Sequence, residues 1–284
     1  MDKPGIAWVF SYYSGTDYYA HFTAIFALLI TRRRTLEKNK AVGIFPQLLL
    51  TSVCVTVILL GIYMNFENPA YRRLEYYNSE VVTSFAALVE NRDNSTGGHI
   101  KRTARYVNII LDKMVKSGRY KKILTKDYIT NVINAAPMHD IGKIATPDAI
   151  LQKPGKLTKE EYDIMKKHAA QGGKIIEETF GELDEPEFLK IAYEVARFHH
   201  EKWNGTGYPD GLSQEGIPLH SRVMAIADVF DAVSAKRCYR DAMPLDDCFR
   251  IIEEGAGADF DPYLAGLFID ARQEIFLSLQ MIHH

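Results

Sequence analysis

Cysteine is scarce in this sequence, and its placement excludes several kinds of site. The 284 residues include three cysteines, Cys54, Cys238 and Cys248. Their number is odd, and their spacing matches neither a metal knuckle nor a disulfide framework. The plain interpretation is a protein of a reducing compartment.

A net charge of either sign is also lacking. Lys and Arg total 34 against 36 Asp and Glu, which gives a formal net charge of -2. Proteins that bind long nucleic acids need a strong basic excess to neutralise phosphates, so the balance argues against bulk nucleic-acid binding. A small anionic ligand needs only a few local Arg or Lys, so the near-neutral net charge is compatible with binding one.

Charged residues are missing altogether from 43–66. This apolar run is long enough to cross a hydrocarbon layer of about 30 Å, so it predicts a transmembrane helix. A buried helix of a globular core is the alternative, although such a helix would normally show a wider polar stripe. The earlier segment 6–30 holds Asp17 and His21 and is spanning, interfacial or re-entrant. We therefore expect an N-terminal hydrophobic, membrane-associated helical segment over 1–70.

Strand-like alternation is weak beyond Tyr71, where apolar residues recur with helical spacing instead. We expect a mainly helical domain over 76–284. The pattern predicts helices at 81–89, 107–114 with an end at Gly118, 128–136, 159–180, 187–200, 222–235, 245–254 and 262–278. The stretch 202–219 is rich in Gly and Pro, and an irregular loop of that length in a compact helical domain is more often functional than accidental.

Histidine and aspartate form a suggestive series in the helical part. The members are His99, His139, Asp140, His168, His199, His200 and Asp228. Neutral imidazole nitrogens, together with carboxylates that can bridge two cations, suit iron, manganese or zinc better than magnesium or calcium. Each signal alone is weak, because a single His in a helix is more often a surface or core residue than a metal ligand.

The joint pattern resembles the HD-GYP family. His139-Asp140-Ile141-Gly142-Lys143 and the run HHEKWNGTGYP at 199–209 are similar to the two signatures of that family. The similarity extends over about 85–276 and includes ENRDNSTGGH at 90–99, LQKPGKLT at 151–158, and the segments 216–232 and 260–262. The resemblance implies an all-α, HD-type helical bundle domain with a metal-dependent phosphodiesterase site for c-di-GMP.

The resemblance also implies a role for each matching residue. One divalent metal would be bound by His99, His139, Asp140 and Asp228, and a second by Asp140, His168, His199 and His200. Of the two catalytic positions, Lys143 would sit by the scissile phosphate and Asp231 would orient water or ligands. Arg237 and Arg240 would hold substrate phosphate, whereas outside the family pattern their plain interpretation is a solvated helix end.

The loop Gly207-Tyr208-Pro209 has two interpretations that can both hold. As a tight turn, it would use positive φ at Gly205 and Gly207 and the restraint of Pro209. As a functional element, it would form a lip over the metal site and contact partner proteins.

The implied reaction is hydrolysis of c-di-GMP to linear pGpG, GMP or both in bacterial second-messenger signalling. Two divalent ions, iron or manganese, would lower the pKa of a bridging water so that hydroxide can attack phosphorus. The alternatives are a catalytically silent cyclic-dinucleotide receptor and a hydrolase of a mixed cyclic GMP-AMP. No ligand of the two-metal site is missing, which favours the enzyme. A homodimer and diguanylate-cyclase-type protein partners stay open.

A few positions depart from the family pattern. Ser95 stands four residues before His99, where some members have a glutamate that supports a third metal. The serine side chain is shorter and neutral, so we expect two metals. Cys238 replaces a usual proline and Lys236 a common acidic residue, and both lie beside the proposed phosphate-binding arginines.

Two features indicate different locations for the catalytic domain. The basic loop 31–40 would lie in the cytoplasm by the positive-inside rule, and a single crossing at 43–66 would then place the catalytic domain on the other side. A nucleotide substrate argues for a cytoplasmic domain, and we give that argument more weight. We expect the inner membrane with the catalytic domain in the cytoplasm, or a cytoplasmic protein if the segment is not inserted.

Overall fold

The computed structural model describes residues 52–53, 55–56, 69–92, 98–181, 186–235 and 243–280, with the side chains of all but 69–78 and 280. The chain divides into two compact units, Met1–Tyr76 and Tyr77–His284. The second unit contains the site described below.

The regular secondary structure of the described residues is helical, apart from one isolated bridge between Ala256 and Phe260. The α-helices are α3 (Pro69–Glu90), α4 (His99–Ser117), α5 (Lys126–Ala135), α6 (Asp148–Leu151), α7 (Lys159–Met165), α8 (Lys167–Phe180), α9 (Pro186–Phe198), α10 (Leu219–Ser234), α11 (Leu245–Glu254), α12 (Pro262–Asp270) and α13 (Arg272–Gln280). The 3₁₀ helices are η2 (Ala136–Met138), η3 (Ile141–Ala145) and η4 (Gln214–Gly216). The expected all-helical fold is confirmed for this part of the chain.

Helix α4 presents a continuous buried face to its neighbours. Its apolar residues recur every three or four positions, and Tyr106, Val107 and Ile110 are fully buried. The face packs against α10, α12 and α5. The Tyr106 ring meets the Phe230 ring of α10 edge-on, with 5.2 Å between centroids. The helix ends where predicted, at Gly118 with φ 75°.

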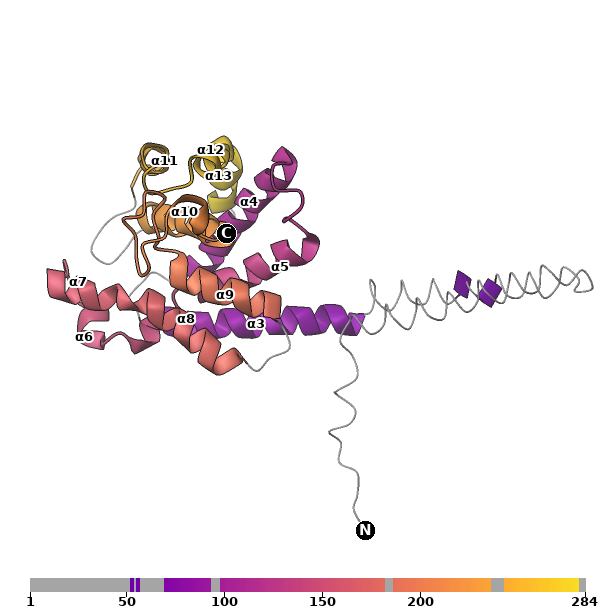
Figure 1. Cartoon of the computed structure of the whole chain (residues 1–284), viewed down its shortest axis with the longest axis horizontal. Helices are drawn as coiled ribbons and strands as arrows, with labels where there is room; N and C mark the ends of the chain where they lie inside the picture. The colour runs from indigo at the N-terminus through magenta and orange to yellow at the C-terminus, as the bar shows by residue number, and fades with distance from the viewer. Residues whose placement is uncertain are drawn as a thin grey trace, which may run out of the picture. The chain divides into compact units, whose positions relative to one another are not determined.

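A close backbone approach places the first signature beside α8. Helices α8 and α9 run side by side (Figure 1), and η3 packs against α8. A Cβ atom on Gly142 of η3 would lie 1.9 Å from the His168 carbonyl oxygen and 2.5 Å from the Gly172 nitrogen. Only glycine permits this approach, which brings the His139-Asp140 pair next to His168.

Two helices that the sequence predicts as continuous are each divided, which corrects that prediction. The stretch 159–180 breaks between α7 and α8, and 262–278 breaks at Ala271. At the first break the Met165 carbonyl accepts a hydrogen bond from the His168 ring at 2.7 Å, while the Ala169 N–H donates to Lys166 at 3.4 Å. A side chain that takes a carbonyl from the helical ladder interrupts the helix.

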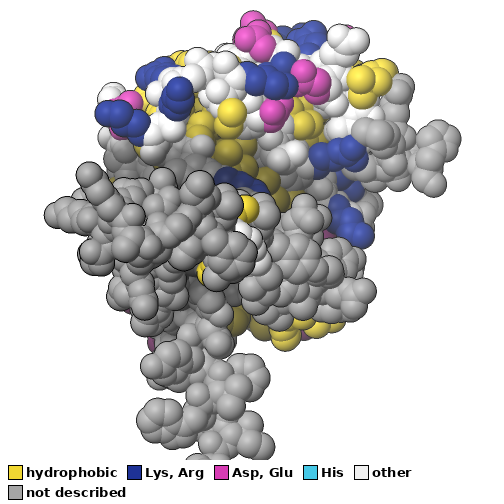
Figure 2. All heavy atoms as spheres, turned by 90° about the vertical axis from the view of Figure 1, so that its right-hand side faces the viewer, with side chains coloured by type: hydrophobic (Ala, Val, Ile, Leu, Met, Phe, Trp, Pro, Cys, Tyr) yellow, Lys and Arg dark blue, Asp and Glu magenta, His cyan; other side chains and the backbone are white. Residues whose placement is uncertain are grey.

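The predicted membrane segment 43–66 lies almost wholly outside the described residues, as do 6–30 and the basic loop 31–40. Within the part of the chain that the structure describes, no helix combines the length and the apolar character needed to cross a membrane. On the face drawn in Figure 2, basic and acidic side chains are interspersed over the upper part, which agrees with the near-neutral composition.

Candidate metal centre

Two groups of side chains converge in the second unit. One group is His99, His139 and Asp228, and the other is His168, His199 and His200. In each group the candidate ligand atoms lie within 4.8 Å of one another. The first group comes from the start of α4, the end of η2 and α10, and the second from α8 and the end of α9. Residues that are up to 129 positions apart in the sequence thus meet at one place.

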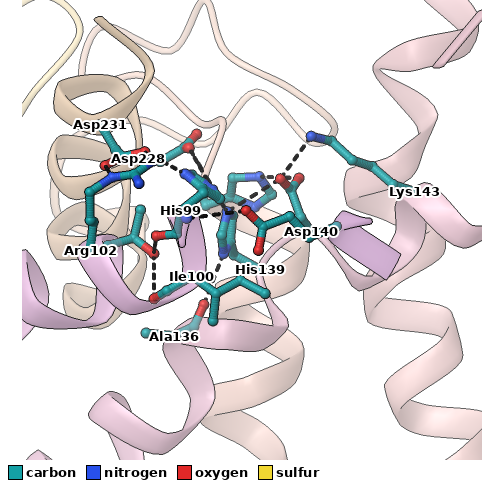
Figure 3. Close-up of polar contacts among 12 residues, drawn as sticks. His99, Ile100, Arg102, Ala136, His139, Asp140, Lys143, Asp228 and Asp231 are labelled. Carbon is teal, nitrogen blue, oxygen red and sulfur yellow. Dashed lines mark hydrogen bonds and ion pairs between the residues drawn. The ribbon is translucent and has the colours of Figure 1, made fainter. Parts of the chain in front are cut away.

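Asp140 lies between the two groups. Its Oδ2 is 3.4 Å from Nε2 of His139, and its Oδ1 is 3.3 Å from Nε2 of His168 and 3.9 Å from Nε2 of His199. Figure 3 shows Lys143 reaching toward this carboxylate, and its Nζ is 2.8 Å from Oδ2. One carboxylate therefore offers an oxygen to each group.

Three of the rings are oriented by backbone carbonyls. Nδ1 of His139 lies 2.9 Å from the Ala136 oxygen, and Nδ1 of His199 lies 3.0 Å from the Val195 oxygen. His168 makes the corresponding contact with Met165. These carbonyls lie at helix ends or breaks, where backbone acceptors need outside donors. Donation from Nδ1 leaves the Nε2 lone pair directed at the centre, which is the arrangement typical of metal-binding histidines.

His99 is oriented by a carboxylate instead. Its Nδ1 lies 2.8 Å from Oδ2 of Asp231. Asp231 also accepts two hydrogen bonds from Arg102, at 2.6 Å from Nε and 3.0 Å from Nη2. Figure 3 shows Arg102 and Asp231 together beside His99. The sequence expectation that Asp231 orients ligands has a concrete counterpart here, because the residue that it contacts is the candidate ligand His99.

Burial and neighbouring charges set the protonation of the rings. Burial lowers the pKa of His199 to about 3, and the His139 and His168 rings act in the same direction. Burial also lowers the pKa of His168 and of His200. For His139, burial opposes the charge, but the Asp140 and Asp228 carboxylates outweigh it and raise the pKa to about 9. The second group is therefore neutral, as metal ligation requires, whereas His139 would lose a proton to solvent when a metal ion binds.

The Asp140 and Asp231 carboxylates stay ionised. Burial alone would raise the pKa of Asp140, but Lys143 and His139 outweigh it and hold that pKa well below its usual value. Burial likewise opposes the charge on Asp231, whose pKa is lowered by the hydrogen bonds from His99 and Arg102. The anionic Asp140 therefore lies between the neutral rings of the second group and a His139 ring that carries a proton.

A cavity of about 810 Å³ opens over the centre. Its walls include Asp140, Lys143, His168, His200 and Tyr208. A volume of this size is in the range of small-molecule sites. The Tyr208 ring lies over the His200 ring, with 4.8 Å between centroids.

The loop of the second signature is held by backbone contacts, and one sequence expectation needs correction. Gly205 has positive φ as predicted, but Gly207 does not. Gly207 instead approaches the backbone, where a Cβ atom would lie 2.3 Å from the Lys202 nitrogen. The following residues are tied down by Glu201, whose Oε1 accepts hydrogen bonds from the Asp210 and Gly211 N–H groups at 2.7 and 3.0 Å. Pro209 follows Tyr208 through a cis peptide bond.

Several residues that sequence reasoning singled out lie outside the described residues. These are the proposed phosphate-binding Arg237 and Arg240, together with Ser95, Lys236 and Cys238. The described site contains the other candidate residues: His99, His139, Asp140, Lys143, His168, His199, His200, Asp228, Asp231 and the loop Gly207-Tyr208-Pro209.

Sequence reasoning missed two arginines. Arg102 follows His99 by three positions on α4, so helical spacing alone places the two side chains on one face. Arg92 donates to the Ile144 carbonyl at 2.8 Å and to Asp148 at 2.7 Å, and thereby ties the chain just after α3 to the end of η3 and the start of α6. Nothing in the sequence pattern indicates the contacts of Arg92.

Comparison with known proteins places this arrangement in a family. The HD domain family matches residues 85–264. A cyclic di-GMP phosphodiesterase of Vibrio cholerae is 44% identical over 227 residues, which cover 78% of this chain and 46% of that protein. A cyclic di-GMP phosphodiesterase of Thermotoga maritima is 36% identical over 205 residues, covering 72% and 52%. A 3'3'-cGAMP-specific phosphodiesterase 2 of Vibrio cholerae is 37% identical over 218 residues, covering 75% and 39%.

The chain spans about half the length of these curated relatives, or somewhat less. The matched region holds both signatures and every residue of the two His/Asp groups. The chain belongs to the HD domain family, in its HD-GYP branch.

Proposed function

We propose that the chain is a metal-dependent phosphodiesterase that hydrolyses c-di-GMP to linear pGpG, GMP or both. The observation that carries the proposal is the Asp140 carboxylate, whose two oxygens face two separate groups of imidazole nitrogens beneath a cavity. Curated relatives named cyclic di-GMP phosphodiesterases support the choice of substrate.

The donor set fits two divalent ions, for which we propose iron or manganese, since mixed imidazole and carboxylate ligation suits both. His99, His139 and Asp228 would hold one ion, and His168, His199 and His200 the other, with Asp140 shared. When bound, such ions supply Lewis acidity toward phosphate oxygens and a water of lowered pKa as nucleophile.

The protein supplies charge and orientation around that chemistry. Lys143 borders the cavity, and its ammonium group lies next to Asp140. This positive charge would attract a phosphate of the substrate. Asp231 holds His99 in place. We propose that Arg237 and Arg240, outside the described residues, bind substrate phosphate. Replacing either by Ala should then raise KM about tenfold to a hundredfold without changing metal content.

Location and partners are part of the proposal. We propose that the catalytic domain lies in the cytoplasm, which a nucleotide substrate supports, and that segment 43–66 attaches it to the inner membrane. Tyr208 of the loop Gly207-Tyr208-Pro209 borders the cavity, and we propose this loop as a contact for diguanylate-cyclase-type proteins. Cell fractionation of the full chain, and of a variant with three Lys placed within 43–66, tests the attachment: only the first should sediment with membranes.

A turnover assay tests the activity directly. The full chain, loaded with Fe²⁺ or Mn²⁺ under anaerobic conditions, is incubated with c-di-GMP, and products are separated by chromatography. We expect linear pGpG or GMP with the metal-loaded chain and neither with a chelated sample. Binding of c-di-GMP without turnover, at full metal content, would make the protein a receptor instead.

A mixed cyclic dinucleotide is the second candidate substrate. It is favoured by the relative named as specific for 3'3'-cGAMP, which is 37% identical. The same assay with equal concentrations of the two dinucleotides decides between them by the ratio of kcat/KM.

A further inference from the structure

Helix α3 carries an apolar stripe that faces solvent. The side chains of Val81, Phe85 and Leu88 are 53%, 60% and 64% exposed. Phe85 and Leu88 are the most exposed of the large hydrophobic side chains in the described part of the chain. Burial of large apolar side chains is favourable, so a contiguous exposed stripe of them indicates a contact surface.

The stripe is distinct from the face that α3 presents to its own domain. Ala86 and Val89 are the buried residues of α3, at 4% and 6% exposure, and both border the cavity. At the end of the helix, Glu90 accepts the His99 backbone N–H at 3.1 Å, and Arg92 holds the Ile144 carbonyl. These contacts fix the rotation of α3 and keep the stripe of Val81, Phe85 and Leu88 turned away from the described domain.

The spacing of the stripe identifies the kind of partner. The steps of four and three residues from Val81 to Phe85 to Leu88 are those of a heptad seam, along which two helices pack knobs into holes. The sequence continues the same spacing backwards through Asn78 and Leu74. Leucine or valine thus recurs at every seventh position, 74, 81 and 88. The intervening positions of the seam are 78 and 85, and the first of them is an asparagine. A single seam asparagine is typical of parallel two-stranded coiled coils.

The charge pattern permits the partner to be a second copy. Ser84 and Asn91 flank the stripe and are uncharged and exposed, so a two-fold pair brings no like charges together there. Glu80 precedes Val81 and is rotated from it by about 100° around the helix axis, so its charge lies off the stripe. A symmetric contact of this kind uses the same patch on both chains, as two-fold dimers do.

We infer that Val81, Phe85 and Leu88 of α3 form the interface of a parallel homodimer, in which α3 pairs with α3 of a second copy of this chain. The inference goes beyond the proposed function, because it concerns a surface outside the cavity. It gives this part of the chain two roles. The stripe of α3 pairs two chains, while Glu90 contacts the backbone of the candidate ligand His99 and Arg92, just after the helix, contacts η3 and α6.

Disulfide trapping tests the pairing and its direction. In the full chain with Cys54 and Cys238 changed to Ser, Val81→Cys and Leu88→Cys are oxidised with diamide and compared on non-reducing gels. We expect a homodimer band from each, because a parallel seam places each position opposite itself. Glu80→Cys, exposed but off the seam, is the matched control and should stay monomeric.

Two results would overturn the inference. One is cross-linking of Glu80→Cys as strong as that of Leu88→Cys, which would indicate random collision. The other is a band only when Val81→Cys and Leu88→Cys are mixed, which would indicate an antiparallel pair.

Sedimentation velocity gives an independent measurement. Phe85→Glu should weaken dimerisation of the full chain by at least about tenfold relative to Glu80→Lys, since it places a charge in each half of an apolar seam. Phe85 is exposed, so the variant should retain its helical circular dichroism and its metal content. A wild-type chain that stays monomeric at tens of micromolar would refute the dimer, whereas failure of the hydrolysis assay would leave it intact.

Discussion

Asp231 contacts the candidate ligand His99 on the side of the ring that faces away from His139, with 2.8 Å between Oδ2 of Asp231 and Nδ1 of His99. Nε2 of His99 then lies 3.1 Å from Nε2 of His139 and 3.7 Å from Oδ1 of Asp228. Asp231 is itself fixed by Arg102. A carboxylate behind a ligating imidazole fixes the ring and increases its basicity.

Asp231→Asn should therefore weaken metal binding without abolishing it. The substitution keeps the shape of the side chain but removes the negative charge that His99 and Arg102 share. Loss of such a partner typically costs about tenfold to a hundredfold in metal affinity. Competition with a chromophoric chelator measures the change. The control is Asp247→Asn, which alters an exposed pair with Arg250 on α11. Equal affinity in the two variants would show that Asp231 does not support the centre.

Arg92→Ala should lower kcat with little effect on metal content. Arg92 binds the Ile144 carbonyl and Asp148, and so fixes the end of η3, which carries Lys143, and the start of α6. Hydrogen bonds of this kind contribute about 0.5–1.5 kcal/mol each, which corresponds to a reduction of about twofold to tenfold per bond if this segment must be ordered in the transition state. Lys116→Ala, which removes an exposed pair with Asp112, serves as control. Unchanged kcat in Arg92→Ala would mean that η3 and the start of α6 keep their position without the arginine.

Gly142→Ala should destabilise the domain strongly. Its Cβ would lie within 3 Å of the His168 oxygen, the Gly172 nitrogen and the Gly172 Cα, all backbone atoms, so η3 and α8 must separate. Overpacking of this kind costs about 3 kcal/mol. Gly266→Ala, in α12 with nothing within 4 Å of the new Cβ, should instead be neutral or stabilise by about 0.5–1 kcal/mol. Thermal unfolding of the two variants compares them, and equal melting temperatures would contradict the close approach.

The sequence predicted the helices well where a single apolar face decides the structure, as at 245–254, and the residues of the candidate site were identified through the resemblance. It did not predict the break before α8, because that break depends on the His168 ring reaching the Met165 carbonyl. The sequence suggested that Gly207 is a glycine because it needs positive φ. In the structure the reason is instead a close approach to the backbone of the folded loop, which leaves no room for a Cβ atom. Arg92 was missed because its partners lie more than fifty positions away. The exposure of Val81, Phe85 and Leu88 also depends on tertiary structure, since their spacing alone fits a buried face equally well.

The central claim is that one carboxylate joins two metal sites, and metal content of purified variants tests it most directly. Metal per chain is measured by elemental analysis after anaerobic loading of the wild type, His99→Ala, His168→Ala and Asp140→Ala. We expect a ratio near two for the wild type and near one for each histidine variant. For Asp140→Ala we expect a ratio near zero, because both sites lose a ligand and the charge that balances the cations. A ratio near two in folded Asp140→Ala protein would show that Asp140 does not join the two sites.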